Sequence, residues 1–162
     1  MRYRGLLYRA LNPVWARDPL SGEGARRFGG RFNPRGTPAL YTSTTIMTAV
    51  REANQIGALQ PTTLVSYDAD VEPVFDAEDT AALANFDVTE ELLAANDWRA
   101  RMAHDGVASA QGLALRLIAA GYAGIRVRSF ARGTGSDDMN VVLWAWDAEQ
   151  LVLNDSERRL RR

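Results

Sequence analysis

The chain has 162 residues, of which 46% are hydrophobic and 24% charged, and this fits one globular domain with a core of its own. Its 19 basic and 20 acidic side chains give a net charge of −1, which argues against nucleic-acid binding through a broadly basic surface. The absence of cysteine excludes disulfides, thiolate metal sites and a cysteine nucleophile.

The first part of the chain predicts two short strands separated by a long loop. Residues 5–10 form the first predicted strand, which Asn12 and Pro13 end. Residues 16–37 are rich in Gly, Arg and Pro and show no hydrophobic period, so we expect a loop. A loop of this length in a compact domain is usually functional or disordered. Residues 38–42 form the second predicted strand.

A helix is predicted next, with Ser43 or Thr44 as its N-cap and an end near Ile56, where Gly57 closes it. Apolar residues recur on one face of this helix at three- and four-residue spacing: Ile46, Ala49, Val50 and Ala53.

The middle of the chain predicts a long strand and a group of short helices. Residues 62–72 alternate in polarity, which predicts a strand, and Pro73 interrupts it before a short continuation at 74–76. The predicted inward side of the strand carries Val65, Tyr67, Ala69 and Val71. Residues 78–104 predict short helices whose apolar side chains are Leu83, Phe86, Leu92, Leu93 and Trp98.

The last part predicts a helix, two strands and a basic tail. The helix covers residues 111–120 and ends at Gly121. Its apolar face carries Leu113, Leu117 and Ala120. Strands are predicted at 123–128 and 140–146, with a polar loop at 131–138 between them. Residues 154–162 end in RRLRR and are expected to be a frayed helix or a disordered end, after a domain spanning 1–153.

The irregular order of strands and helices indicates the fold class. Without a steady βαβ rhythm, we expect an α+β single domain with a mixed, mostly antiparallel sheet flanked by helices. The N-terminus has too short an apolar run for a signal peptide, and no stretch approaches the roughly 20 apolar residues of a membrane span. A cytoplasmic location is therefore expected.

Several motif classes are missing. The single histidine, His104, lies in a polar context, which indicates a solvated side chain and leaves too few ligands for a His/Cys zinc site. No metal is expected. A Gly-x-Ser-x-Gly elbow does not accompany His104, and the glycine-rich run at 22–36 lacks the Gly-Lys-Ser/Thr ending of a Walker loop.

One combination of residues suggests chemistry on a dinucleotide. Arg31, after a flexible Gly29-Gly30 pair, offers a planar set of donors suited to a diphosphate. Tyr41 offers a flat ring for stacking. Glu52, on the predicted helix, can stabilise the positive charge that develops when an N-glycosidic bond breaks.

Each of these residues has a plainer interpretation when it is taken alone. Arg31 then holds the loop to a surface carboxylate, Tyr41 is a core aromatic, and Glu52 is a solvated helix residue. The combination, and not any single residue, favours the dinucleotide site.

The string GGRFNPRGTPALYTS at 29–43, followed by AVRE at 49–52, resembles the hallmark of RES-domain proteins, a family named for an Arg, a Glu and a Ser. The resemblance continues more weakly through Leu7–Arg9, through residues 124–129, and at Asn140. In place of the proline that often precedes the family's late serine stands Arg128, so Ser129 is the first candidate for that serine and Ser136 the second.

The resemblance implies a relative of the ADP-ribosyltransferase fold that uses NAD as its substrate. Arg31 and Arg9 would bind phosphates or ribose, Tyr41 would stack on nicotinamide, and Glu52 would support departure of the leaving group. Ser129 would hydrogen-bond the ligand, and Asn140 is counted with the NAD-binding residues.

The resemblance further implies a toxin of a bacterial type II toxin–antitoxin system, bound to an Xre-type antitoxin that covers the NAD pocket. The expected reaction transfers ADP-ribose from NAD to a target protein. Two alternatives stay open: a glycohydrolase or phosphorylase that depletes NAD, and a non-catalytic nucleotide-binding module.

Overall fold

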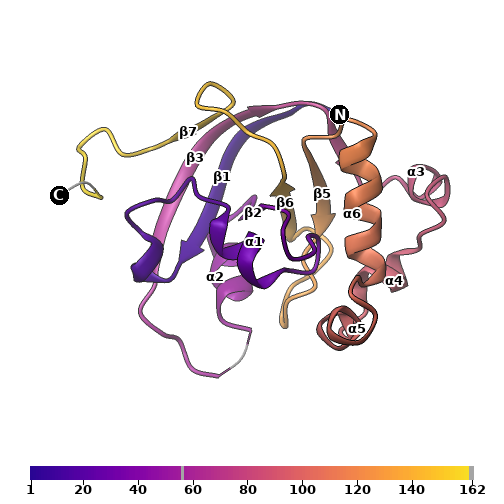
Figure 1. The fold of residues 1–162 in the computed structure, drawn as a ribbon. Helices are drawn as coiled ribbons and strands as arrows, with labels where there is room; N and C mark the ends of the chain where they lie inside the picture. The colour runs from indigo at the N-terminus through magenta and orange to yellow at the C-terminus, as the bar shows by residue number, and fades with distance from the viewer. Residues whose placement is uncertain (56, 161–162) are drawn as a thin grey trace.

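The structure, a computed structural model, describes residues 1–55 and 57–160. Within these residues, seven strands form one sheet in the order β4-β5-β6-β2-β1-β3-β7. Only β4 and β5 pair in parallel in the described part, and the other neighbours are antiparallel. The predicted α+β class with a mixed, mostly antiparallel sheet is therefore confirmed (Figure 1). The strands are β1 (Tyr3–Leu11), β2 (Leu40–Ser43), β3 (Thr63–Val71), β4 (Val74–Asp76), β5 (Gly124–Arg128), β6 (Met139–Leu143) and β7 (Leu151–Leu153).

The long strands β1 and β3 run antiparallel over their whole lengths, from the pair Tyr3↔Val71 to the pair Leu11↔Thr63. The predicted inward side of β3 is confirmed, because its four residues are buried and their neighbours in the strand are not. Strand side chains point alternately to opposite faces, so a period of two in the sequence marks one buried face.

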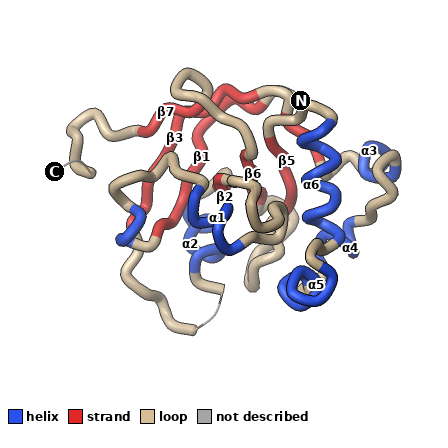
Figure 2. Tube along the Cα trace, viewed as in Figure 1, coloured by secondary structure: helices blue, strands red, loops and turns tan. Residues whose placement is uncertain are grey.

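The core consists of two apolar clusters, and the first of them holds helices against the sheet. One cluster lies over β5 and β6 and includes Leu113 and Leu117 of the helix α6 together with Ile125 of β5. The other lies between β1, β3 and neighbouring strands and includes Leu7 and Tyr67. The helices are α1 (Glu23–Phe28), α2 (Ile46–Ala53), α3 (Thr80–Ala84), α4 (Glu90–Ala94), α5 (Trp98–Asp105) and α6 (Ser109–Ala119). Figure 2 shows α6 alongside β5, with α1 and α2 at the centre of the molecule.

The predicted loop at 16–37 is wrong in one respect, because it contains the short helix α1. A 3-10 turn, Pro13–Trp15, precedes the segment. Helix α1 has no buried residue and does not show an apolar face, so hydrophobic periodicity could not reveal it. Instead, ion pairs from Glu23 to Arg26 and Arg27 support it at spacings of three and four residues.

The helix α2 is shorter than predicted. Its N-cap is Thr45, whose side chain accepts a hydrogen bond from Thr48 N, and its C-cap is Asn54. The predicted end near Ile56 lies outside the described residues. The predicted apolar face is also wrong in part, because Ile46 is 49% exposed while the polar Thr48 is fully buried.

Other boundaries differ at the ends of elements. Strand β6 stops at Leu143 because the chain turns there, and the buried Trp144 packs in the first cluster from outside the strand. Strand β7 was not predicted, since three residues are too short for a readable period. Ala120 is exposed at the C-cap of α6 and does not belong to its apolar face.

Residues 154–160 form turns after β7, with Leu160 packed against the second cluster. None of the helices in the described part of the chain is long and apolar enough to span a membrane.

Candidate active site

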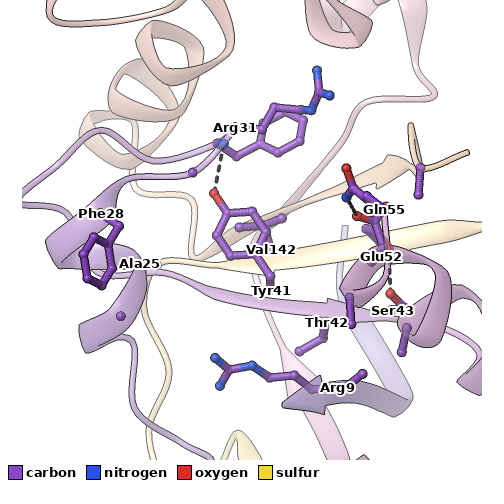
Figure 3. A pocket seen from close by; sticks show the side chains of 18 of the residues that line it. Arg9, Ala25, Phe28, Arg31, Tyr41, Thr42, Ser43, Glu52, Gln55 and Val142 are labelled. Carbon is purple, nitrogen blue, oxygen red and sulfur yellow. Dashed lines mark hydrogen bonds between the residues drawn. The ribbon is translucent and has the colours of Figure 1, made fainter. Parts of the chain in front are cut away.

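A cavity of about 480 Å³ opens in the region enclosed by β1, β2, β6 and the helices α1, α2 and α5. This volume lies in the usual range of small-molecule sites. The structure places five of the six sequence-predicted site residues on its wall, and Figure 3 shows four of them with labels. The five are Arg9, Arg31, Tyr41, Glu52 and Asn140.

Hydrogen bonds on both oxygens hold the Glu52 carboxylate. Its Oε1 accepts from Asn140 Nδ2 at 2.7 Å and from the hydroxyl of Ser129, while its Oε2 accepts from Gln55 Nε2 at 2.9 Å. The first two donors come from β6 and from the residue directly after β5, far away in the sequence. They fix the direction of a side chain that would otherwise rotate freely on the helix.

The orientation of the Asn140 amide is itself determined by a neighbour. Ser43 faces Asn140 across β2 and β6, and its hydroxyl donates to Asn140 Oδ1 at 2.7 Å. Because the amide oxygen accepts from Ser43, the amide nitrogen is the group that faces Glu52. A chain of three side chains therefore runs from the sheet to the carboxylate.

Ser129 has a different position from the one expected for a ligand-binding residue. It is 1% exposed and does not line the cavity, and its hydroxyl donates to Glu52 while accepting from Ala131 N at 3.2 Å. The structure thus makes it a support for Glu52. The second candidate, Ser136, is exposed in the loop between β5 and β6.

Tyr41 presents its ring and not its hydroxyl to the cavity. Its Oη donates to Asn33 Oδ1 at 2.6 Å and accepts from Phe32 N at 3.0 Å. Both hydrogen bonds of the hydroxyl therefore go to the loop before β2. Burial raises the pKa of Tyr41, and the hydroxyl stays protonated near neutral pH.

Arg31 projects from a tight turn in which Gly30 and Asn33 exchange backbone hydrogen bonds. A Cβ on Gly30 would overlap Tyr41 Oη, so only glycine lets the turn lie this close to the ring. Gln111 of α6, fully buried, supports the same turn by donating from Nε2 to Gly30 O at 2.8 Å and to Asn33 O at 3.2 Å.

The guanidinium of Arg31 is partly engaged with the end of α4. Its Nη1 donates to Leu93 O at 3.0 Å and Ala95 O at 2.7 Å, and its Nη2 to Asn96 Oδ1 at 3.3 Å. The group also lies 5.3 Å from the ring centroid of Phe130. A guanidinium has five N–H donors, so two are left for a ligand among the residues that the structure describes.

Arg9 lies on β1, on the other side of Tyr41 from Arg31 in the view of Figure 3. Its Nη1 donates to Pro19 O at 3.2 Å, which ties it to the segment before α1. Burial lowers the pKa of Arg31, and the Glu52 carboxylate acts in the opposite direction.

His104 is 88% exposed in α5, as its polar context predicted. No group of three or more His, Cys, Asp or Glu side chains that could hold a metal ion was found within residues 1–55 and 57–160.

A model of the RES domain family matches residues 6–162, nearly the whole chain. The chain belongs to the RES domain family. Among solved structures, it is similar to a chain in the crystal structure of the M. tuberculosis MbcT–MbcA toxin–antitoxin complex, with a TM-score of 0.72 and 25% sequence identity. The similarity covers 94% of this chain and 82% of that chain. A search of curated proteins gave no match.

Sequence reasoning missed residues that hold the side chains of the cavity wall in place. Ser43 was predicted only as a possible helix N-cap at the end of the hallmark string, and Gln55 only as part of the helix end. Nothing in their spacing indicates contact with the carboxylate network. Gln111 lies in a predicted helix, but its contacts with a turn 81 and 78 residues away depend on tertiary packing.

Proposed function

We propose that this RES domain is the toxin of a toxin–antitoxin pair and cleaves the nicotinamide–ribose bond of NAD. Membership of the family and the similarity to a toxin–antitoxin complex support the toxin role. The observation that carries the chemical part is the Glu52 carboxylate, which accepts from Asn140 of β6 and from Ser129 directly after β5. It lies on the wall of a cavity that also contains Tyr41 and Arg31.

The geometry fits cleavage of a cationic N-glycoside. The electron pair of the breaking C–N bond leaves with nicotinamide, which becomes neutral, and the positive charge passes to the ribose ring. A carboxylate held in place stabilises this oxocarbenium-like state without having to reorganise. Glu52 meets that requirement because hydrogen bonds on both of its oxygens restrict its motion.

The other residues suit the remaining parts of the dinucleotide. The Tyr41 ring, with its hydroxyl directed into the protein, provides a flat surface for the nicotinamide. The two remaining donors of Arg31 suit phosphate oxygens, and Arg9 supplies a second positive charge on another part of the wall.

An antitoxin of the Xre type is the proposed partner, and it would neutralise the toxin by covering the cavity. The cavity wall includes Phe28, which is 68% exposed at the end of α1. Aromatic side chains are enriched at protein–protein interfaces, so Phe28 offers an apolar contact to a partner that covers the cavity.

The direct test is to incubate the purified protein with NAD and measure free nicotinamide. We expect release by the wild-type chain and a loss of at least about 100-fold in Glu52→Gln, as for removal of one electrostatic catalytic group. Glu78→Gln, which changes an exposed carboxylate outside the cavity, is the matched control and should keep full activity. Nicotinamide release that survives Glu52→Gln would contradict the proposal.

The acceptor of ADP-ribose is a protein side chain in our proposal. NAD labelled in its adenylate part, added with a cell lysate, should give a discrete labelled protein band. Loss of NAD without such a band would instead assign the acceptor as water or phosphate, and binding without turnover would indicate a nucleotide-binding module.

A further inference from the structure

Three arginines line the cavity: Arg9, Arg31 and Arg99. In residues 1–55 and 57–160, none of the three lies within ion-pair distance of a carboxylate. The cavity wall contains two carboxylates, those of Asp18 and Glu52. Its cations therefore exceed its anions, and none of the three cations is neutralised by direct contact.

Arg99 was not predicted as a site residue. It is the second residue of α5, and its guanidinium carbon lies 4.3 Å from the ring centroid of Trp98, which also lines the cavity. Contact with an aromatic face orients a guanidinium and leaves its N–H groups, which lie in the plane of the group, available to an anion.

The nearest acid in the sequence does not serve Arg99. Asp97 accepts from Arg101 Nε at 2.7 Å, one helical turn along α5. Arg101 lines a separate groove between α5 and α6 and not the cavity. Arg101 and Arg99 lie on the same short helix but differ in their partners. Arg101 is paired with Asp97 outside the cavity, whereas Arg99 lines the cavity without a carboxylate partner among the described residues.

Arg99 also acts on Arg31. Both guanidinium groups line the same cavity, so their charges repel each other. Burial lowers the pKa of Arg31 most, Glu52 raises it, and the positive charge of Arg99 lowers it further. An anion bound between them would relieve this repulsion. A diphosphate, with negative charge on two adjacent groups, would do so for both arginines at once.

We propose that Arg99 binds phosphate and, together with Arg31, holds the diphosphate of a dinucleotide in the cavity. This inference rests on the proposed function for the choice of NAD as the ligand. It adds a specificity element: Arg99 distinguishes a dinucleotide from a nucleoside that carries no phosphate.

The test is calorimetric binding of NAD and ADP-ribose to the wild-type chain and to two variants, Arg99→Ala and Arg101→Ala. We expect Arg99→Ala to weaken binding of both ligands about tenfold, as for the loss of one charge-assisted hydrogen bond at an exposed site. Arg101→Ala removes the same charge from the same helix and should leave binding unchanged. Arg99→Lys keeps the charge without the planar donors and should give an intermediate affinity.

A kinetic comparison adds a second readout. With nicotinamide riboside, which has no phosphate, kcat/KM should be equal in the wild-type and Arg99→Ala enzymes, while with NAD it should fall about tenfold. A general loss of structure would lower both values.

The outcomes separate this inference from the proposed function. If no variant, including the wild type, releases nicotinamide but Arg99→Ala still weakens ADP-ribose binding, the reaction is wrong and the role of Arg99 stands. If nicotinamide is released normally and Arg99→Ala binds both ligands as tightly as Arg101→Ala does, the role of Arg99 is refuted. Absence of any binding to the wild-type chain would also refute it.

Discussion

The turn that carries Arg31 depends on one buried amide, and replacing Gln111 with Met tests this dependence. Methionine fills a similar volume but cannot donate or accept as the amide does. The hydrogen bonds of Nε2 to Gly30 O and Asn33 O are lost, together with a weaker one to Met102 Sδ, although each carbonyl keeps its partner across the turn. The backbone N–H of Ala108, which donates to Gln111 Oε1 at 2.9 Å, loses its acceptor in a buried place.

These losses can be converted into an expected stability change. Two hydrogen bonds at about 1 kcal/mol each and one buried N–H left without an acceptor, at about 1–3 kcal/mol, give a loss of about 3–5 kcal/mol. In a chain of this size 1 kcal/mol corresponds to about 2–4 °C in Tm, so a fall of roughly 6–20 °C is expected. Urea unfolding followed by circular dichroism measures the free energy directly.

The matched control is Gln60→Met, which changes an exposed glutamine and should shift stability by no more than about 0.5 kcal/mol. Gln111→Met should also lower kcat/KM for nicotinamide release at a temperature where the variant is fully folded, because the turn positions Arg31. A variant as stable as the wild type would show that the turn does not rely on the buried amide, and the reasoning would fail.

Two other predictions concern the carboxylate network and pH. Ser129→Ala removes one donor from Glu52 without altering the cavity wall. The kcat for nicotinamide release should therefore fall about 10- to 100-fold while KM is unchanged. A rise in KM alone would mean that Ser129 contacts the substrate. Hydrogen bonds from Arg26 and Arg27 lower the pKa of Glu23 from 4.5 to about 2. A lowered pKa stabilises the fold above the unfolded value, so the Tm difference between wild type and Glu23→Gln should be constant above about pH 5 and disappear as the pH falls towards 2. A difference that persists unchanged at pH 2 would contradict the assigned cause.

The sequence predicted the parts of the fold that have a strong period. The four buried residues of β3 and the apolar Leu113 and Leu117 of α6 repeat at the spacing that their element requires, and both elements were found. Helix α1 and strand β7 were missed because the first has no buried face and the second has three residues. The burial of Thr48 could not be predicted from the local sequence either, because its hydroxyl donates to Asp138 in a loop 90 residues away.

The candidate site also contains residues that the sequence could reveal and contacts that it could not. Residues close together in the sequence, from Arg31 to Glu52, could be found as one pattern. Ser129 and Asn140 were predicted as site residues through the family resemblance alone. Their hydrogen bonds to Glu52 could not be predicted, because they lie 77 and 88 residues from it and reach it only through the order of strands in the sheet. The pairing of β2 with β6, and of β6 with β5, is what brings both donors to one carboxylate.

Glu52 and the residues that orient it lie on different elements, and this affects which substitutions change the site. Arg31 lies on a tight turn and Glu52 on the short helix α2, and neither element has a large buried face of its own. The groups that orient Glu52 lie on β6 and directly after β5, and most residues of both strands are buried. The sheet therefore fixes the position of the Glu52 side chain, which the short helix does not fix by itself. Substitutions in or next to β5 and β6 should then affect the chemistry at Glu52 even where their side chains never reach the cavity. Ser129 is the clearest example, because it donates to Glu52 but does not line the cavity.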